Sequence, residues 1–237
     1  MIDRDARDCL ATLIESYLDE QIAAFEFDEK IQDVAGKSDD EAVRHIAQAL
    51  WFYYDDCKDH TVVLSKQQWD YFQRLVLLLR SDAEFQVDRL RIWSWRHAVA
   101  AIGLAGFVFA AARLGFGGHL FIVAMLFGLL SMLIAWSRPN PSKVHPDEWM
   151  RLSPFGSFMD MLAVRRRVAS FHKRRYPHEL AGKRIRSPLM DRAIWLQSYC
   201  LWLLFSPVAL LIQSLPDCEE RTRALAPNVV LANRRAV

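Results

Sequence analysis

Residues 120–136 constrain the fold more than any other part of the chain, because these seventeen residues include no charge and a single serine. The segment has no polar face at a helical period, so a helix formed here must be buried on all sides. Ten of its residues are Leu, Ile, Phe or Val, which together favour insertion into a bilayer by about 3–6 kcal/mol. With Gly118, His119 and Ser137 it reaches the ~20 residues that span a membrane. We therefore expect a transmembrane helix rather than the core helix of a soluble domain.

A second apolar segment, residues 98–112, comes just before the first and reaches membrane-spanning length when residues 93–97 are included. The glycine-rich residues 114–118 between the two segments fit a tight turn. Small residues spaced four apart allow close contact between membrane helices, and the candidates for helix packing are Gly106, Ala110, Ala124 and Gly128. We predict a transmembrane helical hairpin over residues 91–137.

A third apolar segment covers residues 193–215 and carries no formal charge. Gln197, Pro207 and Gln213 weaken it as a membrane span. A proline kink near Pro207 is tolerated in a membrane when neighbours bond the freed backbone groups. We expect a third membrane helix here, and both a spanning and a re-entrant arrangement stay open.

Basic residues flank the hairpin and are nearly absent around its turn, where only Arg113 and His119 stand on either side of residues 114–118. By the positive-inside rule, both flanks should lie in the cytoplasm and the turn outside. We expect a multi-pass protein of the cell inner (plasma) membrane with a cytoplasmic N-terminus. If the third segment spans, the C-terminal tail, residues 216–237, is external. The flanking basic residues are Arg89, Arg91, Arg96, Arg138, Lys143 and Arg151.

Residues 1–90 are expected to form a small acidic, cytosolic, helical domain. Residues 1–88 contain 20 acidic and 9 basic residues, a net charge of −11. Apolar residues between Leu10 and Leu18 follow a helical stripe. Capping-box patterns at residues 38–41 and 65–68 predict the starts of two further helices, and no alternating strand pattern interrupts them.

Residues 138–192 form a basic juxtamembrane segment. Residues 137–192 contain 13 basic and 5 acidic residues, a net charge of +8. Apolar residues from Phe158 to Phe171 lie mostly on one side of a predicted amphipathic helix. Such a helix next to a membrane contacts anionic headgroups, and the predicted contact residues are Arg165, Arg166, Arg167, Lys173, Arg174 and Arg175. The alternative is that these basic residues pair with the acidic domain, in the same molecule or in a neighbour. Binding to nucleic acid is disfavoured, because no stacking aromatic residues accompany them.

Few residues have the arrangement that catalysis or metal binding needs. The densest polar cluster, residues 54–60, could offer Asp55, Asp56, Asp59 and His60 as ligands or acid–base groups. It has no second ligand cluster at a recognisable spacing, so a solvated helix end and loop is the preferred interpretation. The four cysteines are too widely spaced for a zinc or disulfide pattern. We predict no catalytic residue, metal or cofactor.

Together these patterns predict an all-α chain with a cytosolic helical domain, a membrane hairpin, a basic amphipathic segment and a third membrane helix. We expect a membrane-anchored, non-enzymatic interaction or regulatory protein, with membrane lipids and a protein partner or a second copy as its partners. One alternative is an oligomerising, membrane-disrupting effector of a bacterial toxin or phage-defence type. A lipid-directed enzyme is the other, and it has the least support, since no convergent catalytic groups are visible.

Overall fold

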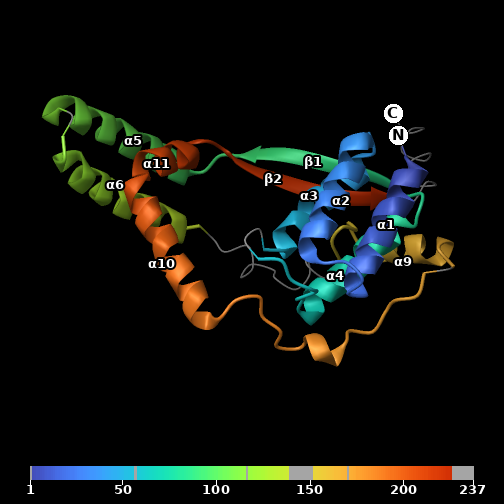
Figure 1. The fold of residues 1–237 in the computed structure, drawn as a ribbon. Coiled ribbons are helices and arrows are strands. Elements are labelled where there is room, and N and C mark those ends of the chain that lie inside the picture. The colour runs from blue at the N-terminus through green and yellow to red at the C-terminus, as the bar shows by residue number, and fades with distance from the viewer. Residues whose placement is uncertain (1, 56–57, 116, 139–151, 170, 226–237) are drawn as a thin grey trace, which may run out of the picture. The chain divides into compact units, whose positions relative to one another are not determined.

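The computed structural model describes residues 2–55, 58–115, 117–138, 152–169 and 171–225, and most of these are helical (Figure 1). The chain divides into two compact units. Unit 1 comprises Met1–Asp88, His145–Ile185 and Arg221–Val237, and unit 2 comprises Arg89–Val144 and Arg186–Glu220. The prediction of a predominantly helical chain is confirmed. Most of the C-terminal tail lies outside the described residues.

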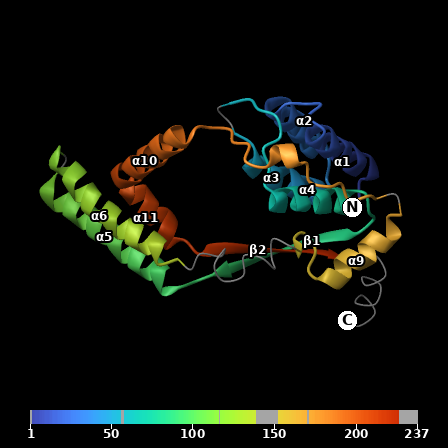
Figure 2. The same cartoon turned by 90° about the horizontal axis from the view of Figure 1, so that it is seen from below.

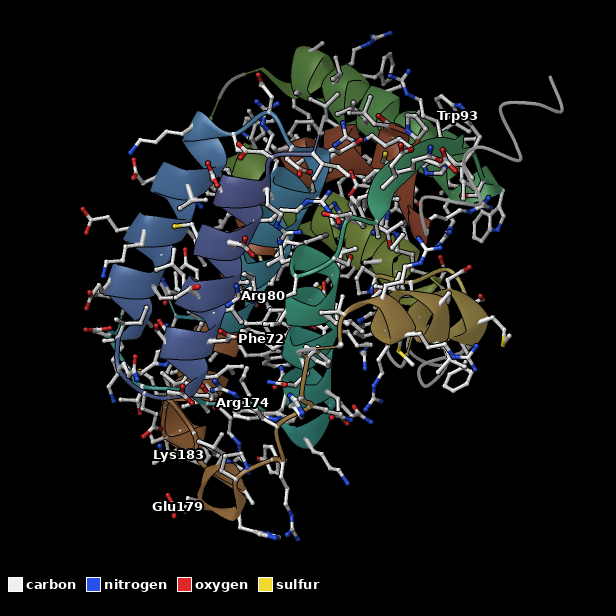
Figure 3. The ribbon with its side chains drawn as sticks, turned by 90° about the vertical axis from the view of Figure 1, so that its right-hand side faces the viewer. Phe72, Arg80, Trp93, Arg174, Glu179 and Lys183 are labelled. Atoms are coloured by element: carbon white, nitrogen blue, oxygen red, sulfur yellow. The ribbon has the colours of Figure 1, made fainter. Side chains whose placement is uncertain are left out.

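Four helices build the apolar core of unit 1: α1 (Arg4–Leu18), α2 (Ala24–Lys37), α3 (Glu41–Leu50) and α4 (Lys66–Leu79). A short 3-10 turn, η1 (Trp51–Tyr53), follows α3. Phe72 of α4 is fully buried among these helices (Figure 3). α2, which buries only Ala24, Phe27 and Ile31, is not among the predicted helices.

Side-chain hydrogen bonds cap the starts of two helices of unit 1, α4 and α3. Ser65 and Gln68 form the predicted capping box at the start of α4. The box predicted at residues 38–41 is wrong in register, because Asp40, not Ser38, caps α3 and accepts a hydrogen bond from the Ala42 N–H. Ser38 instead donates its hydroxyl to Asp3 at 2.8 Å.

The basic segment of unit 1 contains α9 (Phe158–Arg167) and a 3-10 turn, η2 (His178–Leu180). The amphipathic helix predicted to run from Phe158 to Phe171 ends earlier than expected, at Arg167. Phe171 and the basic residues 173–175 lie beyond it, outside any helix or strand. Three consecutive arginines end α9 where positive charge interacts favourably with the helix dipole.

Unit 2 contains the predicted hairpin, formed by α5 (Trp95–Leu114) and α6 (His119–Trp136), which lie side by side (Figures 1 and 2). Both helices are long and apolar enough to cross a membrane. Gly115 ends α5 with φ of +74° and donates its N–H to the Ala111 carbonyl. A residue with a side chain rarely adopts that φ, so glycine suits this helix end.

The third apolar segment forms two helices, α10 (Pro188–Leu204) and α11 (Ser206–Ser214), that meet at Phe205 with a bend of 81° (Figure 2). The predicted kink near Pro207 is therefore a complete break. Pro207 stands in the first turn of α11, where the missing N–H costs no helical hydrogen bond. Both helices pack against the hairpin: α10 against α6, and α11 against α5 and α6.

Two strands, β1 (Glu84–Ile92) and β2 (Asp217–Leu225), form a two-stranded sheet that the all-α prediction had missed. The strands run in opposite directions (Figure 2). Arg89 of β1 pairs with Glu220 of β2 at 2.9 Å. β1 leads directly into α5, and β2 follows directly after α11.

Candidate functional site

The hairpin turns most of its apolar side chains outward. Only 17% of the most apolar window of α5, and 22% of that of α6, is buried within the chain. Ile102, Phe121 and Ile122 are each about two-thirds exposed or more, at 72%, 64% and 66%. Exposed apolar surface of this extent is typical of helices that contact lipid. Two or three helices of this chain could therefore cross a membrane.

The four predicted helix-packing residues meet different neighbours. A Cβ on Gly128 would lie 3.0 Å from the Leu203 Cα, so α10 approaches α6 at this glycine. A Cβ on Gly106 would lie 3.3 Å from the ring of Phe127, across the hairpin. Ala124 is buried, and its carbonyl accepts a hydrogen bond from Ser206 of α11 at 2.6 Å. Ala110 is half-buried in α5.

A polar network not foreseen from the sequence joins α6, α10 and α11. Its centre is Ser131, which is fully buried and donates to the Gln213 side-chain oxygen at 3.0 Å. The Trp202 indole donates to the Ser131 hydroxyl at 3.0 Å, and the Gln213 amide donates to the Ser131 carbonyl at 3.1 Å. These bonds engage both the oxygen and the amide group of Gln213, one of the residues that weaken the third segment as a span. Ser131 is the only serine in residues 120–136, and it is the residue from which this network could have been predicted.

Beside this network lies a cavity of about 750 Å³, formed within unit 2 at the N-terminal end of α5 and the C-terminal end of α6. Its volume falls in the range of about 300–1,000 Å³ that is usual for small-molecule sites. Most of its wall is apolar and comes from α10 and α11. Its charged part comes from the first turn of α5, from Arg138 just after α6 and from the start of β2. The lining residues that set its character are Leu201, Trp202, Phe205, Ile212, Arg96, His97, Arg138 and Asp217.

Asp217 lies close to the basic side chains that line this cavity. Arg138 forms an ion pair with it, and the His97 Nε2 lies 3.6 Å from its carboxylate. His97 is buried, and its Nδ1 accepts a hydrogen bond from the Ser94 N–H at 2.7 Å, which assigns the proton of a neutral ring to Nε2. Arg96 lies at 3.9 Å from Asp217. Two arginines thus face one carboxylate, and their summed charge is positive.

Arg96 also carries an unused hydrogen-bond donor. Its Nη1 is buried, and within the described part of the chain no atom accepts a hydrogen bond from it. An unsatisfied charged donor costs free energy unless an acceptor reaches it. The arrangement at this cavity therefore favours binding of a group with negatively charged oxygens.

A second, smaller cavity of about 320 Å³ adjoins the first and shares Ala135, Ser198 and Trp202 with it. Its remaining lining is almost wholly apolar and aromatic, and comes from Met132, Trp136, Trp195 and Tyr199. The rings of Trp195 and Tyr199 contact each other at a tilt of 52°, with their centroids 4.2 Å apart. Aromatic side chains of this kind gather where a membrane meets water.

The six basic residues predicted to contact lipid fall into two groups within unit 1. Arg165, Arg166 and Arg167 are exposed at the end of α9, and Arg175 is exposed in the segment beyond it. Lys173 instead pairs with Asp70 at 2.7 Å, and Arg174, labelled in Figure 3, pairs with Asp19.

Lys183, which is labelled below Arg174 in Figure 3, pairs with Glu20 at 2.6 Å. Three cations of the basic segment thus pair with acidic side chains of residues 1–88 in their own unit. This is the arrangement expected of the alternative in which the two oppositely charged regions pair.

The polar cluster at residues 54–60 has structural contacts at its described residues. The Asp59 carboxylate accepts hydrogen bonds from the N–H groups of Phe25, at 3.1 Å, and His60, at 3.0 Å. It thereby caps α2, whose own N-cap residue, Ala23, provides no side-chain bond. The His60 ring accepts from the Asp55 N–H and contacts the Thr61 carbonyl. No cluster of metal-binding type occurs among the described residues.

Comparison of the chain with protein-family models, curated proteins and solved structures finds no match.

Proposed function

We propose that this chain is a membrane-anchored, non-enzymatic interaction protein, in which unit 2 fixes unit 1 to the cytoplasmic face of the inner (plasma) membrane. The observation that carries the proposal is the contrast between the units. Unit 1 has its own buried core built from α1–α4, whereas the hairpin of unit 2 exposes most of its apolar surface. A folded unit attached to helices that need lipid is the arrangement of an anchored domain.

The orientation is supported by charge. Arg89, Arg91 and Arg96 precede α5 and Arg138 follows α6, whereas the turn region contains Arg113 and His119. Basic residues are retained on the cytoplasmic side. This supports a cytoplasmic position for β1 and for the end of α6.

Contacts within unit 2 also bear on whether the third segment spans. Asp217, at the start of β2, lies beside Arg96 at the start of α5 and pairs with Arg138 after α6, and β2 pairs with β1. Residues 138–187 include no segment apolar enough to cross a bilayer. α10 and α11 would then begin and end on one side. α11, with nine residues, extends only about 14 Å, so we propose a re-entrant pair rather than a third span.

Unit 1 offers exposed aromatic side chains for a partner. Trp51 and Phe52, on η1, are 45% and 73% exposed and contact each other edge to face. Phe25 is 44% exposed. Tryptophan and other aromatic residues are enriched at protein interfaces, and these three are the side chains we propose for partner contact.

The described contacts favour the anchor over the two alternatives. An oligomerising effector would use the small residues for contacts between copies, but Gly106 and Gly128 already meet Phe127 and Leu203 of the same chain. A lipid-directed enzyme would need free acid–base groups, but Asp59 and His60 are engaged in holding α2 and their own loop.

The test is to express the full chain in bacteria while following membrane potential and cell fractionation. The anchored protein should stay in the membrane fraction after alkaline extraction and leave the potential unchanged. Rapid depolarisation that disappears when residues 95–136 are deleted would establish the effector instead. A partner that co-purifies should be lost from the Trp51→Ser/Phe52→Ser variant and kept by Phe158→Ser, which alters another exposed aromatic residue of unit 1.

A further inference from the structure

We propose that the two adjoining cavities of unit 2 form a binding site for one anionic, two-chain phospholipid. The phosphate would bind at Arg96 and Arg138, and the acyl chains would occupy the larger and the smaller cavity. The proposal rests on the membrane insertion of unit 2, which is part of the proposed function, and does not depend on what unit 1 binds.

The first step of the argument is the division of the larger cavity into a charged and an apolar part. Arg96, His97, Arg138 and Asp217 gather at one part of its lining, whereas Leu201, Phe205 and Ile212 supply apolar walls. An occupant that satisfies both parts must be an amphiphile, with an ionic head and a hydrocarbon body. A free anion would leave the apolar walls uncovered, and a neutral hydrocarbon would leave the charges without an acceptor.

The second step concerns the sign of the head. Two arginines face one carboxylate, and Arg96 Nη1 is a buried donor without an acceptor among the described residues. Arginine presents several N–H groups in a planar fork that matches the oxygens of a phosphate. A phosphodiester could accept from Nη1 while Asp217 continues to pair with Arg138. The charge balance therefore selects an anionic rather than a zwitterionic headgroup.

The third step concerns the number of chains. The smaller cavity adjoins the larger one through Ala135, Ser198 and Trp202 and is lined by apolar and aromatic side chains alone beyond these residues. Two connected apolar spaces next to one charged position correspond to the two acyl chains of a glycerophospholipid. The site lies where α5 begins and α6 ends, which is also where the exposed Trp93, Trp95 and Trp136 mark the level of the headgroups.

The experiment is native mass spectrometry of the full chain, purified in a neutral detergent and equilibrated with equal amounts of phosphatidylglycerol and phosphatidylcholine. The wild-type protein should retain one phosphatidylglycerol in preference to phosphatidylcholine. Arg96→Gln should lower this retention about fivefold to tenfold, as expected for a lost phosphate contact. Arg113→Gln, which removes a cation at the opposite end of α5, is the matched control and should retain the lipid as the wild type does.

Ala209→Phe provides a second variant, because Ala209 lines the larger cavity and a phenyl ring there would fill space meant for an acyl chain. It should lower retention without any change of charge. Equal retention of the two lipids by the wild type would overturn the proposal, and so would an equal loss in Arg113→Gln and Arg96→Gln. Inorganic phosphate that displaces the lipid at millimolar concentration would also overturn it, since the acyl chains would then contribute nothing. These readouts use protein already recovered from membranes, so failure here is distinct from failure of anchoring.

Discussion

Arg7 and Asp40 form a buried, two-point ion pair that joins the first helix of unit 1 to the start of its third. The Arg7 Nε donates to one carboxylate oxygen at 2.6 Å and an Nη donates to the other at 3.1 Å, and both side chains are almost inaccessible to solvent. The other Nη donates to the carbonyls of Ser81 and Ala83 beyond α4. One guanidinium thus holds three helices together, and nearly all of its donors are used.

The first prediction concerns this pair. Arg7→Met should destabilise unit 1 by about 3–5 kcal/mol, because it leaves the Asp40 carboxylate buried without its countercharge. The measurement is the free energy of unfolding of the full chain in denaturant, followed by circular dichroism. Arg44→Met is the matched control, since its partner, Asp39, is 95% exposed, and it should cost less than about 1 kcal/mol. Similar losses in both variants would contradict this account of the pair.

The second prediction concerns acid stability. Burial alone would raise the pKa of Asp40, but hydrogen bonds from Arg7 and from the N–H groups of Asp3 and Ala42 lower it below its usual value of 3.8. A hydrogen bond from Arg4 likewise holds the pKa of Asp8 low. A carboxyl with a lowered pKa in the folded state contributes stability that is present above its unfolded pKa and is lost as pH falls. Stability should therefore decline below about pH 4.

Unfolding free energies measured between pH 6 and pH 3 would test this decline. In Arg7→Met the slope below pH 4 should be shallower, because the main group that lowers the pKa of Asp40 is gone. A slope unchanged by the substitution would assign the acid sensitivity to other carboxylates.

The third prediction concerns the close approach of α10 to α6. A side chain at Gly128 would meet the backbone of Leu203, with 3.0 Å to its Cα and 3.1 Å to its carbonyl oxygen. Backbone cannot move aside as a flexible side chain does, so Gly128→Leu should destabilise unit 2 by about 1–3 kcal/mol. Gly118→Ala is the control, because a Cβ there meets nothing within 4 Å. Thermal transitions of both variants in detergent would show whether only the first is shifted.

The fourth prediction tests the orientation of the hairpin. A cysteine at Gly118, in the turn, should react with a membrane-impermeant maleimide in intact cells. Gly118 is preferable to Gly117, where a Cβ would lie 2.9 Å from the His119 ring. The native cysteines must first be replaced by serine, since Cys9, Cys200 and Cys218 are free and exposed and Cys57 is also present. Labelling only after lysis would invert the proposed topology.

The features predicted correctly from the sequence are those set by local pattern. The hairpin follows from uninterrupted apolar residues, and the start of α4 follows from Ser65 and Gln68, three residues apart. α2 is not predicted, for two reasons. Its apolar stripe is narrow, and its N-terminus is capped from a distance: the Asp59 carboxylate accepts a hydrogen bond from the Phe25 N–H, thirty-four residues earlier in the chain. A cap supplied by a residue so far away in the chain cannot be predicted from the residues next to the helix.

The candidate site was less predictable than the fold. Arg96, Arg138 and Gln213 were noted for topology or for their effect on a membrane span, but their convergence with Asp217 depends on the pairing of β1 with β2. Pairing between distant strands is fixed by tertiary contacts rather than by local propensity. In β1, apolar residues alternate at Phe85 and Val87 and again, in the opposite phase, at Leu90 and Ile92, and each run is too short to indicate a strand by itself.

The division of unit 1 into separate stretches of chain has a consequence for its synthesis. Its core helices emerge from the ribosome first, but β2, whose last residues belong to unit 1, is made only after the whole of α5, α6, α10 and α11. Domains generally fold as they are made, so α1–α4 can assemble early, whereas the β1–β2 sheet must wait for the membrane helices. In newly made protein, the pairing of Arg89 with Glu220 should therefore appear last, as a marker of completed insertion.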